Sequence, residues 1–268
     1  MNISCIVVLY NKAIDESSTL KFFSNHAIPN TTVYVYDNST KNYGNKIECQ
    51  KKGWIYLSEK KNVGLAAAYN KTIEYVLKSN RLNIDYFMIL DDDSKLSKEY
   101  FDFLNSILNK ENIQIGVPII KINDRILSPC LVEKCGRIKS VKSIKSLNNK
   151  NITAINNGMI IKSTVFKKIK YNSDLFVDYV DHDFIRQAKK NNIKITVFNY
   201  CLEHNMSIVD NSINEKGRLI RFKIYSKDLK KYYTENLTEK IFVRIHLLNM
   251  GIKYFNKYHN IKFIKLAM

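Results

Sequence analysis

Glycine and long hydrophobic runs are both scarce in this sequence of 268 residues. It contains eight glycines, and neither Gly-x-Gly-x-x-Gly nor Gly-x-x-x-x-Gly-Lys occurs. The absence of these motifs argues against a dinucleotide-binding fold and against a P-loop. No apolar run approaches the ~20 residues that a membrane-spanning helix needs. The apolar segment Ile3–Leu9 is short and lacks the basic flank of a signal peptide, so we interpret it as a first buried strand.

Cysteine is also sparse, and its pattern does not suggest a disulfide framework. The five cysteines are odd in number and irregularly spaced: Cys5, Cys49, Cys130, Cys135 and Cys201. This pattern predicts reduced thiols in a cytosolic protein. A hydrophobic content of 45% with interspersed charges is typical of a globular chain. The length suits one large α/β domain, with or without a small appendage.

The sequence has a formal net charge of +18, and its last part is especially basic. From Arg218 to Met268, twelve Lys or Arg residues stand against three acids. Such a segment attracts an anionic partner, either membrane lipid or nucleic acid. Aromatic residues interleaved with these bases favour an interfacial amphipathic helix, and a basic surface over an ordinary aromatic core is the alternative. The aromatic residues are Phe222, Tyr225, Tyr232, Tyr233, Phe242, Tyr254, Phe255, Tyr258 and Phe263.

The first half of the sequence alternates strand and helix patterns. Strands are predicted at Ile3–Leu9, Thr32–Tyr36, Trp54–Leu57 and Asp85–Leu90, and helices at Ile14–Ser24, Gly64–Lys78 and Lys98–Leu108. This alternation indicates an α/β fold in which helices flank a mostly parallel central sheet.

The second half is less regular. Strands are predicted at Ile115–Ile122, Arg125–Leu131, Thr153–Ile161 and Ile193–Phe198, a helix at Asp181–Lys190, and a basic surface loop at Lys139–Lys150. From Arg218 onward the pattern is mainly helical, which predicts a helical C-terminal region.

Three consecutive carboxylates, Asp91, Asp92 and Asp93, follow the apolar run Tyr86–Leu90. Adjacent like charges repel one another, and a divalent cation such as Mg²⁺ or Mn²⁺ would remove the repulsion because it selects hard oxygen ligands. A buried strand would deliver these carboxylates to the carboxyl edge of the sheet, where ligands bind in α/β folds. The alternative is a solvated acidic turn before a helix capped by Ser94 or Ser97.

Polar residues also follow other predicted elements. Tyr10-Asn11 ends the first strand, Asp37-Asn38-Ser39 ends the second, and Asn62 to Asn70 opens a helix. Gly64 would let the backbone approach a ligand, and the helix that begins there could present N–H groups to a phosphate. These segments would line one crevice with the acidic triplet.

Taken in order, these segments resemble the family-2 glycosyltransferases of the GT-A fold, particularly the bacterial rhamnosyltransferase and galactofuranosyltransferase branch. The matching motifs are Tyr10-Asn11, Asp37-Asn38-Ser39, Asn62-x-Gly64-x-Ala-x-Ala-x-Asn70, Leu90-Asp-Asp-Asp-Ser94, Asn156-Asn157-Gly158, Leu175–Phe184 and His204. The resemblance covers roughly Ile3 to Asn205. It implies a GT-A domain over residues 1–210, followed by a basic, aromatic helical region over residues 211–268. It also implies transfer of a sugar from a nucleotide-sugar to a hydroxyl, with inversion.

The resemblance also assigns roles to individual residues. Asp91 and Asp93 would hold Mn²⁺ or Mg²⁺ with His204, although the flank of His204 departs from the usual family form and an ordinary partly buried histidine is the alternative. Asp92 would meet the ribose or the donor sugar. The remaining nucleotide-sugar contacts it implies are Asp37 to the pyrimidine ring N–H, Tyr10 and Asn11 beside the base, and Asn62, Gly64, Asn70, Asn157 and Gly158.

A general base is needed to take the proton of the acceptor hydroxyl. Three acids, Asp178, Asp181 and Asp183, stand within six residues, and at helical spacing Asp178 and Asp181 would share a face. The resemblance assigns the base to Asp181. The alternative is that Asp178 and Asp181 cap the helix that follows.

These inferences predict a metal-dependent inverting glycosyltransferase that builds a bacterial surface polysaccharide such as a capsule. The donor would be a UDP- or dTDP-sugar, with rhamnose or galactofuranose favoured, and the acceptor a lipid-linked saccharide. The protein would be cytoplasmic and peripheral to the inner face of the cell membrane.

Two other functions would fit part of the sequence. A basic nucleic-acid-binding protein would make no use of the acidic triplet, which would repel phosphate, so we predict no nucleic-acid partner. A metal-dependent sugar nucleotidyltransferase would share the fold, but it needs a glycine-rich loop where this chain has Tyr10-Asn-Lys-Ala.

Overall fold

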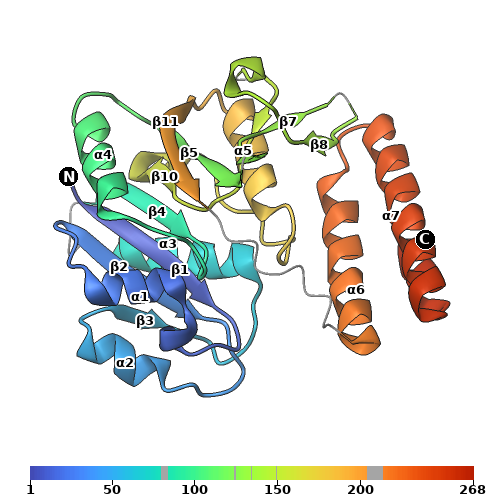
Figure 1. Cartoon of the computed structure of the whole chain (residues 1–268), viewed down its shortest axis with the longest axis horizontal. Coiled ribbons are helices and arrows are strands. Elements are labelled where there is room, and N and C mark those ends of the chain that lie inside the picture. The colour runs from blue at the N-terminus through green and yellow to red at the C-terminus, as the bar shows by residue number, and fades with distance from the viewer. Residues whose placement is uncertain (80–83, 124, 134, 149, 204–213) are drawn as a thin grey trace.

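A twisted central sheet forms the middle layer of the molecule (Figure 1). This computed structural model describes residues 1–79, 84–123, 125–133, 135–148, 150–203 and 214–268. The eight-stranded sheet has the order β11-β5-β10-β4-β1-β2-β3, with β6 paired to β5. Its strands are β1 Ile3–Leu9, β2 Thr31–Asp37, β3 Ile55–Leu57, β4 Tyr86–Leu90, β5 Ile115–Ile122, β6 Arg125–Ser128, β10 Met159–Lys162 and β11 Ile195–Glu203. A three-stranded sheet contains β7 Cys130–Val132, β8 Ile138–Lys139 and β9 Ile152–Thr153.

Most neighbouring strands of the large sheet run parallel, which confirms the predicted α/β class. β1 is parallel to both β2 and β4, β2 to β3, and β5 to β11, whereas β10 is antiparallel to β4 and β5. The register pairs Leu9 with Asp37 and Val7 with Leu90. The carboxyl ends of β1, β2 and β4 therefore meet at one edge of the sheet.

Helices cover both faces of this sheet because its strand side chains alternate between two apolar clusters. Val7 faces the cluster that contains residues of α1, α2 and α4, whereas Ile6 faces the cluster that contains residues of α3 and α5. The helices are α1 Ser18–Asn25, α2 Asn45–Lys51, α3 Leu65–Lys78, α4 Lys98–Leu108, α5 Val180–Lys190, α6 Glu215–Tyr232, α7 Leu237–Tyr258 and α8 Lys262–Ala267. Short 3₁₀ turns occupy Ile14–Glu16, Ile144–Ser146 and Ser163–Lys167.

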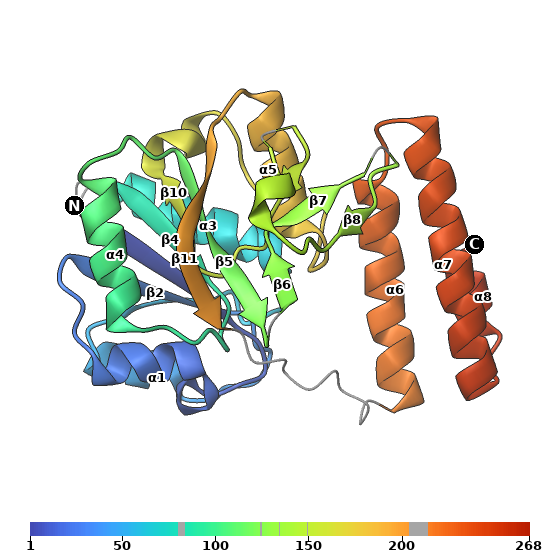
Figure 2. The ribbon, with the colours of Figure 1, turned by 45° about the horizontal axis from the view of Figure 1, so that its top comes forward.

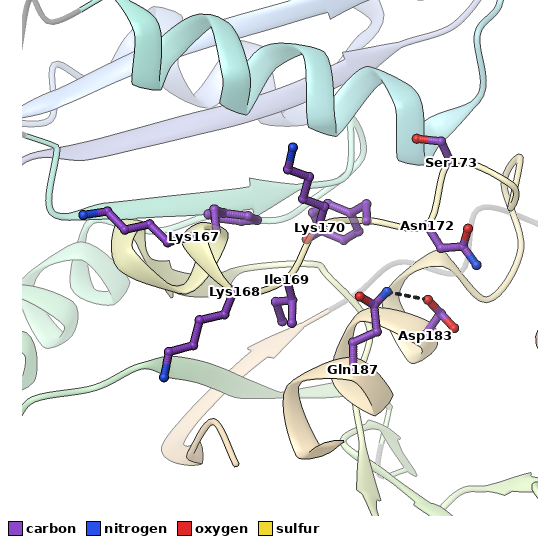
Figure 3. Close-up of a pocket in the computed structure, with 10 residues that line it drawn as sticks. Lys167, Lys168, Ile169, Lys170, Asn172, Ser173, Asp183 and Gln187 are labelled. Atoms are coloured by element: carbon purple, nitrogen blue, oxygen red, sulfur yellow. Dashed lines mark hydrogen bonds between the residues drawn. The ribbon is translucent and has the colours of Figure 1, made fainter. Parts of the chain in front are cut away.

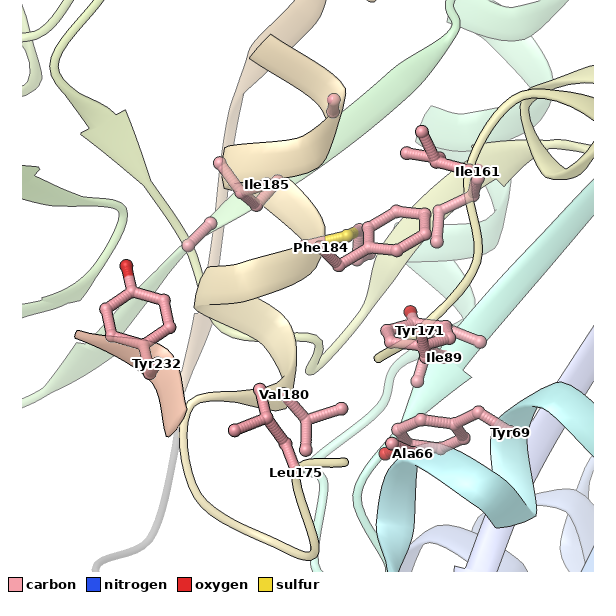
Figure 4. Close-up of a cluster of buried hydrophobic side chains, with 14 of the residues drawn as sticks. Ala66, Tyr69, Ile89, Ile161, Tyr171, Leu175, Val180, Phe184, Ile185 and Tyr232 are labelled. Carbon is pink, nitrogen blue, oxygen red and sulfur yellow. The ribbon is translucent and has the colours of Figure 1, made fainter. Parts of the chain in front are cut away.

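The C-terminal helices lie beside the α/β part, next to the small sheet (Figure 2). Phe222, Leu229 and Tyr232 of α6 belong to the same apolar cluster as side chains of α3 and α5. Figure 4 shows Tyr232 beside α5 and Tyr69 of α3 facing Tyr171, so this cluster joins both parts of the chain. The C-terminal helices therefore share an apolar core with the α/β part.

Three predicted strands are wrong in extent. The strand predicted at Ile193–Phe198 is β11, which begins at Ile195 and continues to Glu203. Arg125–Leu131 is divided at Pro129, which cannot donate to a strand ladder, into β6 and β7 in different sheets. Thr153–Ile161 is interrupted by a turn in which the Met159 N–H donates to the Asn156 carbonyl at 2.8 Å. Gly158 adopts the left-handed φ of 75° that this turn requires. Only β10 continues into the large sheet.

Two helix predictions also need correction. The segment Ile14–Ser24 is a 3₁₀ turn followed by α1, because Ser17 accepts the Leu20 N–H and begins a new helix. The short helix α2 is absent from the prediction because its largely polar sequence carries no strong apolar period.

The aromatic residues of the C-terminal region do not form the outward-facing surface that the interfacial interpretation predicts. Phe222, Tyr232, Tyr233 and Phe263 are buried, and the other five aromatic side chains are partly buried. The alternative of an aromatic core is therefore the observed arrangement. Within the described ranges, no helix is both long and apolar enough to cross a membrane.

Candidate active site

The acidic triplet lies directly after β4, and side chains at the start of α1 bond to its backbone. Thr19 Oγ1 donates to the Asp91 carbonyl at 2.5 Å, and Ser17 Oγ donates to the Asp92 carbonyl at 2.6 Å. Ser94 Oγ donates to the Asp91 carbonyl at 3.0 Å. These bonds use backbone carbonyls, so the three carboxylate side chains remain available for other partners. Ser97, not Ser94, caps α4 by accepting the Tyr100 N–H.

The three carboxylates have different charge environments. Asp92 pairs with Lys12 at 2.5 Å. No Lys or Arg among the described residues forms an ion pair with Asp91 or Asp93. Removal from water, followed by the charges of Asp93, Asp181 and Asp92, raises the pKa of Asp91 to about 7. Asp91 therefore lies in a site with a local excess of negative charge.

Asp181 is brought to this site by α5. It lies in the first turn of the helix, and its charge raises the pKa of Asp91 as well as the pKa values of the buried Tyr69 and Tyr171. The His182 N–H donates to Asp181 Oδ1 at 2.8 Å, which orients the carboxylate. The charge of Asp181 therefore acts on Asp91, one of the two predicted metal ligands.

The two neighbouring acids are committed to other partners. Asp178 lies before α5, not on it, and its Oδ1 accepts from Arg221 Nη2 at 2.6 Å. Asp183 is buried and accepts from Arg186 at 2.6 Å. The predicted shared helical face of Asp178 and Asp181 is therefore wrong. The N-cap residue of α5 is Tyr179, which makes no side-chain cap, so Asp178 does not cap the helix.

Asp37 lies at the end of β2 with both carboxylate oxygens engaged. Oδ1 accepts from the Ser39 N–H at 3.0 Å, and Oδ2 accepts from Asn45 at 2.9 Å and from the Tyr56 hydroxyl at 3.2 Å. Sequence patterns did not indicate Asn45 and Tyr56, because α2 has no strong apolar period and Tyr56 lies inside a strand and not after its end. Asp37 borders a cavity of about 640 Å³ whose lining includes Ser39, Lys41, Lys46, Tyr56 and Lys60.

Tyr10 and Asn11 lie at the same edge, after β1. The Tyr10 side chain is 54% exposed. Asn11 adopts a left-handed φ of 50°, and its N–H donates to Ser39 Oγ at 2.8 Å. The ends of β1 and β2 are thereby tied together at Ser39, which also lines the cavity beside Asp37.

Asn62 and Gly64 lie in the loop before α3, which Asn38 holds. The Val63 N–H donates to Asn38 Oδ1 at 3.1 Å, and Asn38 Nδ2 donates to the Gly64 carbonyl at 3.1 Å. A Cβ at Gly64 would lie 2.7 Å from the Phe176 side chain. The Leu65 N–H donates to the Phe176 carbonyl at 2.5 Å. The segment that approaches Gly64 closely is therefore Phe176 of the same chain, where the sequence predicted a ligand.

The last donor-site candidates, Asn70, Asn157 and Gly158, make hydrogen bonds within the framework of the fold. Asn70 Nδ2 donates to the Tyr171 carbonyl at 2.7 Å. The buried Asn157 accepts from Ser94 Oγ at 2.5 Å. The Gly158 N–H donates to the Ile89 carbonyl at 2.9 Å, which continues the β4–β10 pairing. The contacts of Asn157 and Gly158 position the chain around the end of β4, which precedes Asp91, whereas Asn70 holds the segment at Tyr171.

His204 lies outside the described residues. Across the described parts of the chain, no group of three or more His, Cys, Asp or Glu side chains could hold a metal ion. Two carboxylates are nevertheless a usual protein contribution to Mg²⁺ or Mn²⁺ sites in which substrate phosphates and water complete the coordination. The excess negative charge around Asp91 fits such a cation.

A second cavity, of about 600 Å³, is separate from this site. It is bordered by residues 166–173 together with Asp183 and Gln187. Figure 3 shows Lys167, Lys168 and Lys170 around it and the hydrogen bond of 2.7 Å from Gln187 to Asp183. None of the predicted site residues lines this cavity.

Comparison with known proteins identifies the family. Residues 4–169 match glycosyl transferase family 2, a match over more than half of the chain. The chain belongs to this family. This match establishes the glycosyltransferase class. Neither a nucleotidyltransferase nor a nucleic-acid-binding protein would explain a match to this family.

Two curated relatives are similar over part of their length. The chain is 27% identical over 190 residues to dTDP-rhamnosyl transferase RfbF of Shigella flexneri, which covers 68% of this chain and 62% of the relative. It is 28% identical over 185 residues to an uncharacterized glycosyltransferase of Methanocaldococcus jannaschii, covering 67% of this chain and 57% of the relative. The chain thus spans about three fifths of the length of these relatives.

Solved structures share the fold at low identity. S. aureus TarS superposes with a TM-score of 0.56 and 16% identity, covering 100% of this chain and 51% of TarS. The mannosyltransferase PcManGT of Pyrobaculum calidifontis, in complex with GDP-Man and Mn²⁺, superposes with a TM-score of 0.56 and 10% identity. The superposition covers 99% of this chain and 72% of PcManGT. These similarities confirm the GT-A fold.

Proposed function

We propose that this family-2 glycosyltransferase is a metal-dependent inverting enzyme that transfers a sugar from a pyrimidine nucleotide-sugar to a hydroxyl of a lipid-linked saccharide. The observation that carries the proposal is the proximity of Asp181 on α5 to Asp91 after β4. This arrangement would bring a proton acceptor, Asp181, near Asp91, which would hold the metal that binds the donor diphosphate. The named relative RfbF favours dTDP-rhamnose as the donor, with galactofuranose as the second choice.

The nucleotide would occupy the cavity beside Asp37. A pyrimidine ring carries an N–H that a buried carboxylate can accept, and the exposed ring of Tyr10 offers a stacking surface. Lys41, Lys46 and Lys60 border the cavity and would attract the charged donor. Asn11 shapes its loop through its backbone N–H, and Asn62 shapes the adjoining loop through its side-chain oxygen, which accepts the Gly64 N–H.

Asp91 and Asp93 would hold Mn²⁺ or Mg²⁺, which would stabilise the negative charge on the departing diphosphate. The published complex of PcManGT contains Mn²⁺, and this supports a divalent cation in the present chain. Asp92 is held by Lys12 and would meet the donor ribose or sugar. His204 remains a candidate third ligand.

Asp181 would act as the general base. The acceptor oxygen attacks the anomeric carbon from the face opposite the diphosphate, so a new C–O bond forms as the bond to the phosphate oxygen breaks. The nucleoside diphosphate leaves with the bonding electron pair, and the hydroxyl proton moves to Asp181. Since His182 N–H already holds Oδ1, we assign the proton to Oδ2.

A surface on α7 supports association with the membrane that would carry the acceptor. Five aliphatic side chains, spaced three or four residues apart, are between 41% and 73% exposed: Leu237, Ile241, Ile245, Leu248 and Ile252. We call them the α7 stripe. After the buried Glu239 the chain has six Lys or Arg and no acid. An apolar stripe among bases suits an anionic lipid surface, whereas two copies joined through it would bring bases together.

A thermal-shift screen of nucleotide-sugars, with and without Mn²⁺, tests the donor and metal assignments. Stabilisation by dTDP-rhamnose or UDP-galactofuranose should require Mn²⁺ or Mg²⁺, vanish for Asp93→Ala and persist for Asp181→Asn. Product analysis with the stabilising donor then tests transfer. Equal stabilisation of the wild-type chain and Asp93→Ala would contradict the metal assignment.

A further inference from the structure

Asp228 of α6 is a fully buried carboxylate with an unusual set of partners. Its Oδ1 accepts from the Phe176 N–H at 2.9 Å, and its Oδ2 accepts from the N–H groups of Val177 and Asp178 at 2.8 and 2.9 Å. The side chain has 0% relative exposure. Three consecutive backbone amides thus converge on one carboxylate from a helix that follows them by about fifty residues in the chain.

A second contact from α6 holds the same segment. Arg221, two turns earlier on α6, donates through both terminal nitrogens to Asp178, with Nη2 to Oδ1 at 2.6 Å. Bidentate pairing of this kind fixes orientation as well as distance. We call residues 176–178 the anchored loop, since α6 holds both its backbone and its charged side chain.

The anchored loop connects the two halves of the candidate active site. On one side, the Phe176 carbonyl accepts the Leu65 N–H, at the start of α3, and Phe176 packs against Gly64. On the other side the loop continues through Tyr179 into α5, whose first turn carries Asp181. The donor-side loop and the proposed base are therefore joined through a segment whose position α6 determines.

We propose that Asp228 is a positioning residue for the transfer reaction, which holds the anchored loop so that Asp181 meets the acceptor hydroxyl. This inference rests on the proposed function of Asp181. A misplacement of the reacting groups by about 1 Å can reduce a rate about 100-fold, and α5 begins two residues after the loop. The basic C-terminal region then belongs to the catalytic unit.

The chemistry of the side chain makes the proposal testable. Asp228 uses two acceptor oxygens for three N–H donors, so Asp228→Asn replaces one oxygen with an NH₂ group that faces backbone donors. Arg221→Gln releases the Asp178 side chain and leaves Asp228 in place. Lys227→Gln is the matched control, since Lys227 is an exposed neighbour on the same helix.

Hydrogen–deuterium exchange and steady-state kinetics on the full chain test the two parts of the inference. In Asp228→Asn, the amides of residues 176–178 should exchange at least tenfold faster. Its kcat should fall about 10- to 100-fold, with the KM for the donor changed by less than threefold. Arg221→Gln should lower kcat about threefold to tenfold, and Lys227→Gln should change neither quantity.

The outcomes separate this inference from the proposed function. Unchanged exchange, or faster exchange with an unchanged kcat, would overturn the positioning role. If Asp228→Asn does not fold, Arg221→Gln tests the hold of α6 on the anchored loop by the same two measurements, and unchanged exchange together with an unchanged kcat would overturn that hold. Absence of transfer by the wild-type chain would instead refute the proposed function, whereas the exchange experiment would still report whether α6 holds the loop.

Discussion

Asp181 at the start of α5 lies close enough to Asp91, after β4, for its charge to raise the pKa of Asp91. The two carboxylates belong to segments that are far apart in the sequence, and in the described structure neither pairs with a Lys or Arg. A cation at Asp91 and a proton acceptor at Asp181 are the roles that this arrangement suits.

The metal-free protein should lose stability between about pH 4 and pH 7 through Asp91. The pKa of Asp91 rises from 3.8 to about 7 on folding, so the unfolded chain ionises first as the pH rises. The resulting destabilisation is absent below pH 4 and complete above pH 7. Unfolding free energies of the wild-type chain and Asp91→Asn at pH 5 and pH 8 measure this destabilisation. The stability of the variant relative to the wild-type chain should be greater at pH 8 than at pH 5.

The same pKa predicts how metal affinity depends on pH. A cation must displace the proton from Asp91, so Mn²⁺ affinity should rise as the pH increases to about 7 and then level off. Isothermal titration with Mn²⁺ at pH 6 and pH 8 checks this. Equal affinities at both values would show that Asp91 does not bind the ion.

Asp181→Asn should fold and bind the donor nucleotide but lose about 100- to 10,000-fold in kcat, because the amide cannot accept the acceptor proton. Steady-state kinetics with saturating donor is the measurement. Asp174→Asn is the matched control, since Asp174 lies in the same region with an exposed side chain whose pairing with Lys231 is at the surface. A kcat near the wild-type value for Asp181→Asn would remove it as the base.

Gly64→Ala should destabilise the fold by about 1–3 kcal/mol through strain at φ 84° and, in addition, through collision with Phe176. Denaturant midpoints measure the loss. Gly53→Ala is a control with a similar φ of 68° and no heavy atom within 4 Å of the added Cβ. Equal losses at both positions would mean that the contact with Phe176 contributes nothing.

The α7 stripe should bind vesicles that contain anionic lipid. Replacing Ile245 and Leu248 together with Ser should reduce binding about tenfold and leave the melting temperature within a few degrees, because both side chains are exposed. Ile220→Ser, an equally exposed change on α6, is the control. Vesicle sedimentation checks the result, and binding that neither depends on anionic lipid nor responds to the double substitution would contradict the assignment.

Local patterns were enough to predict much of the fold. The bounds of β1, α4 and β5 agree with the sequence prediction because each element has a clear apolar period or a buried run, and Ser97 marks the start of α4. The acidic triplet was located correctly after β4 for the same reason. Short elements such as α2 and β8 were not predicted, because they gain their stability from tertiary contacts.

By itself the sequence determined the alternating α/β order, the polar ends of β1, β2 and β4, and the excess of bases after Arg218. The packing of distant segments determines that the charge of Asp181 acts on Asp91, that Gly64 meets Phe176, and that Asp228 holds the loop before α5. Periodicity and capping act over a few residues and can be read locally. Partners far apart in the chain are chosen by how the sheet and the C-terminal helices pack, which no short segment encodes.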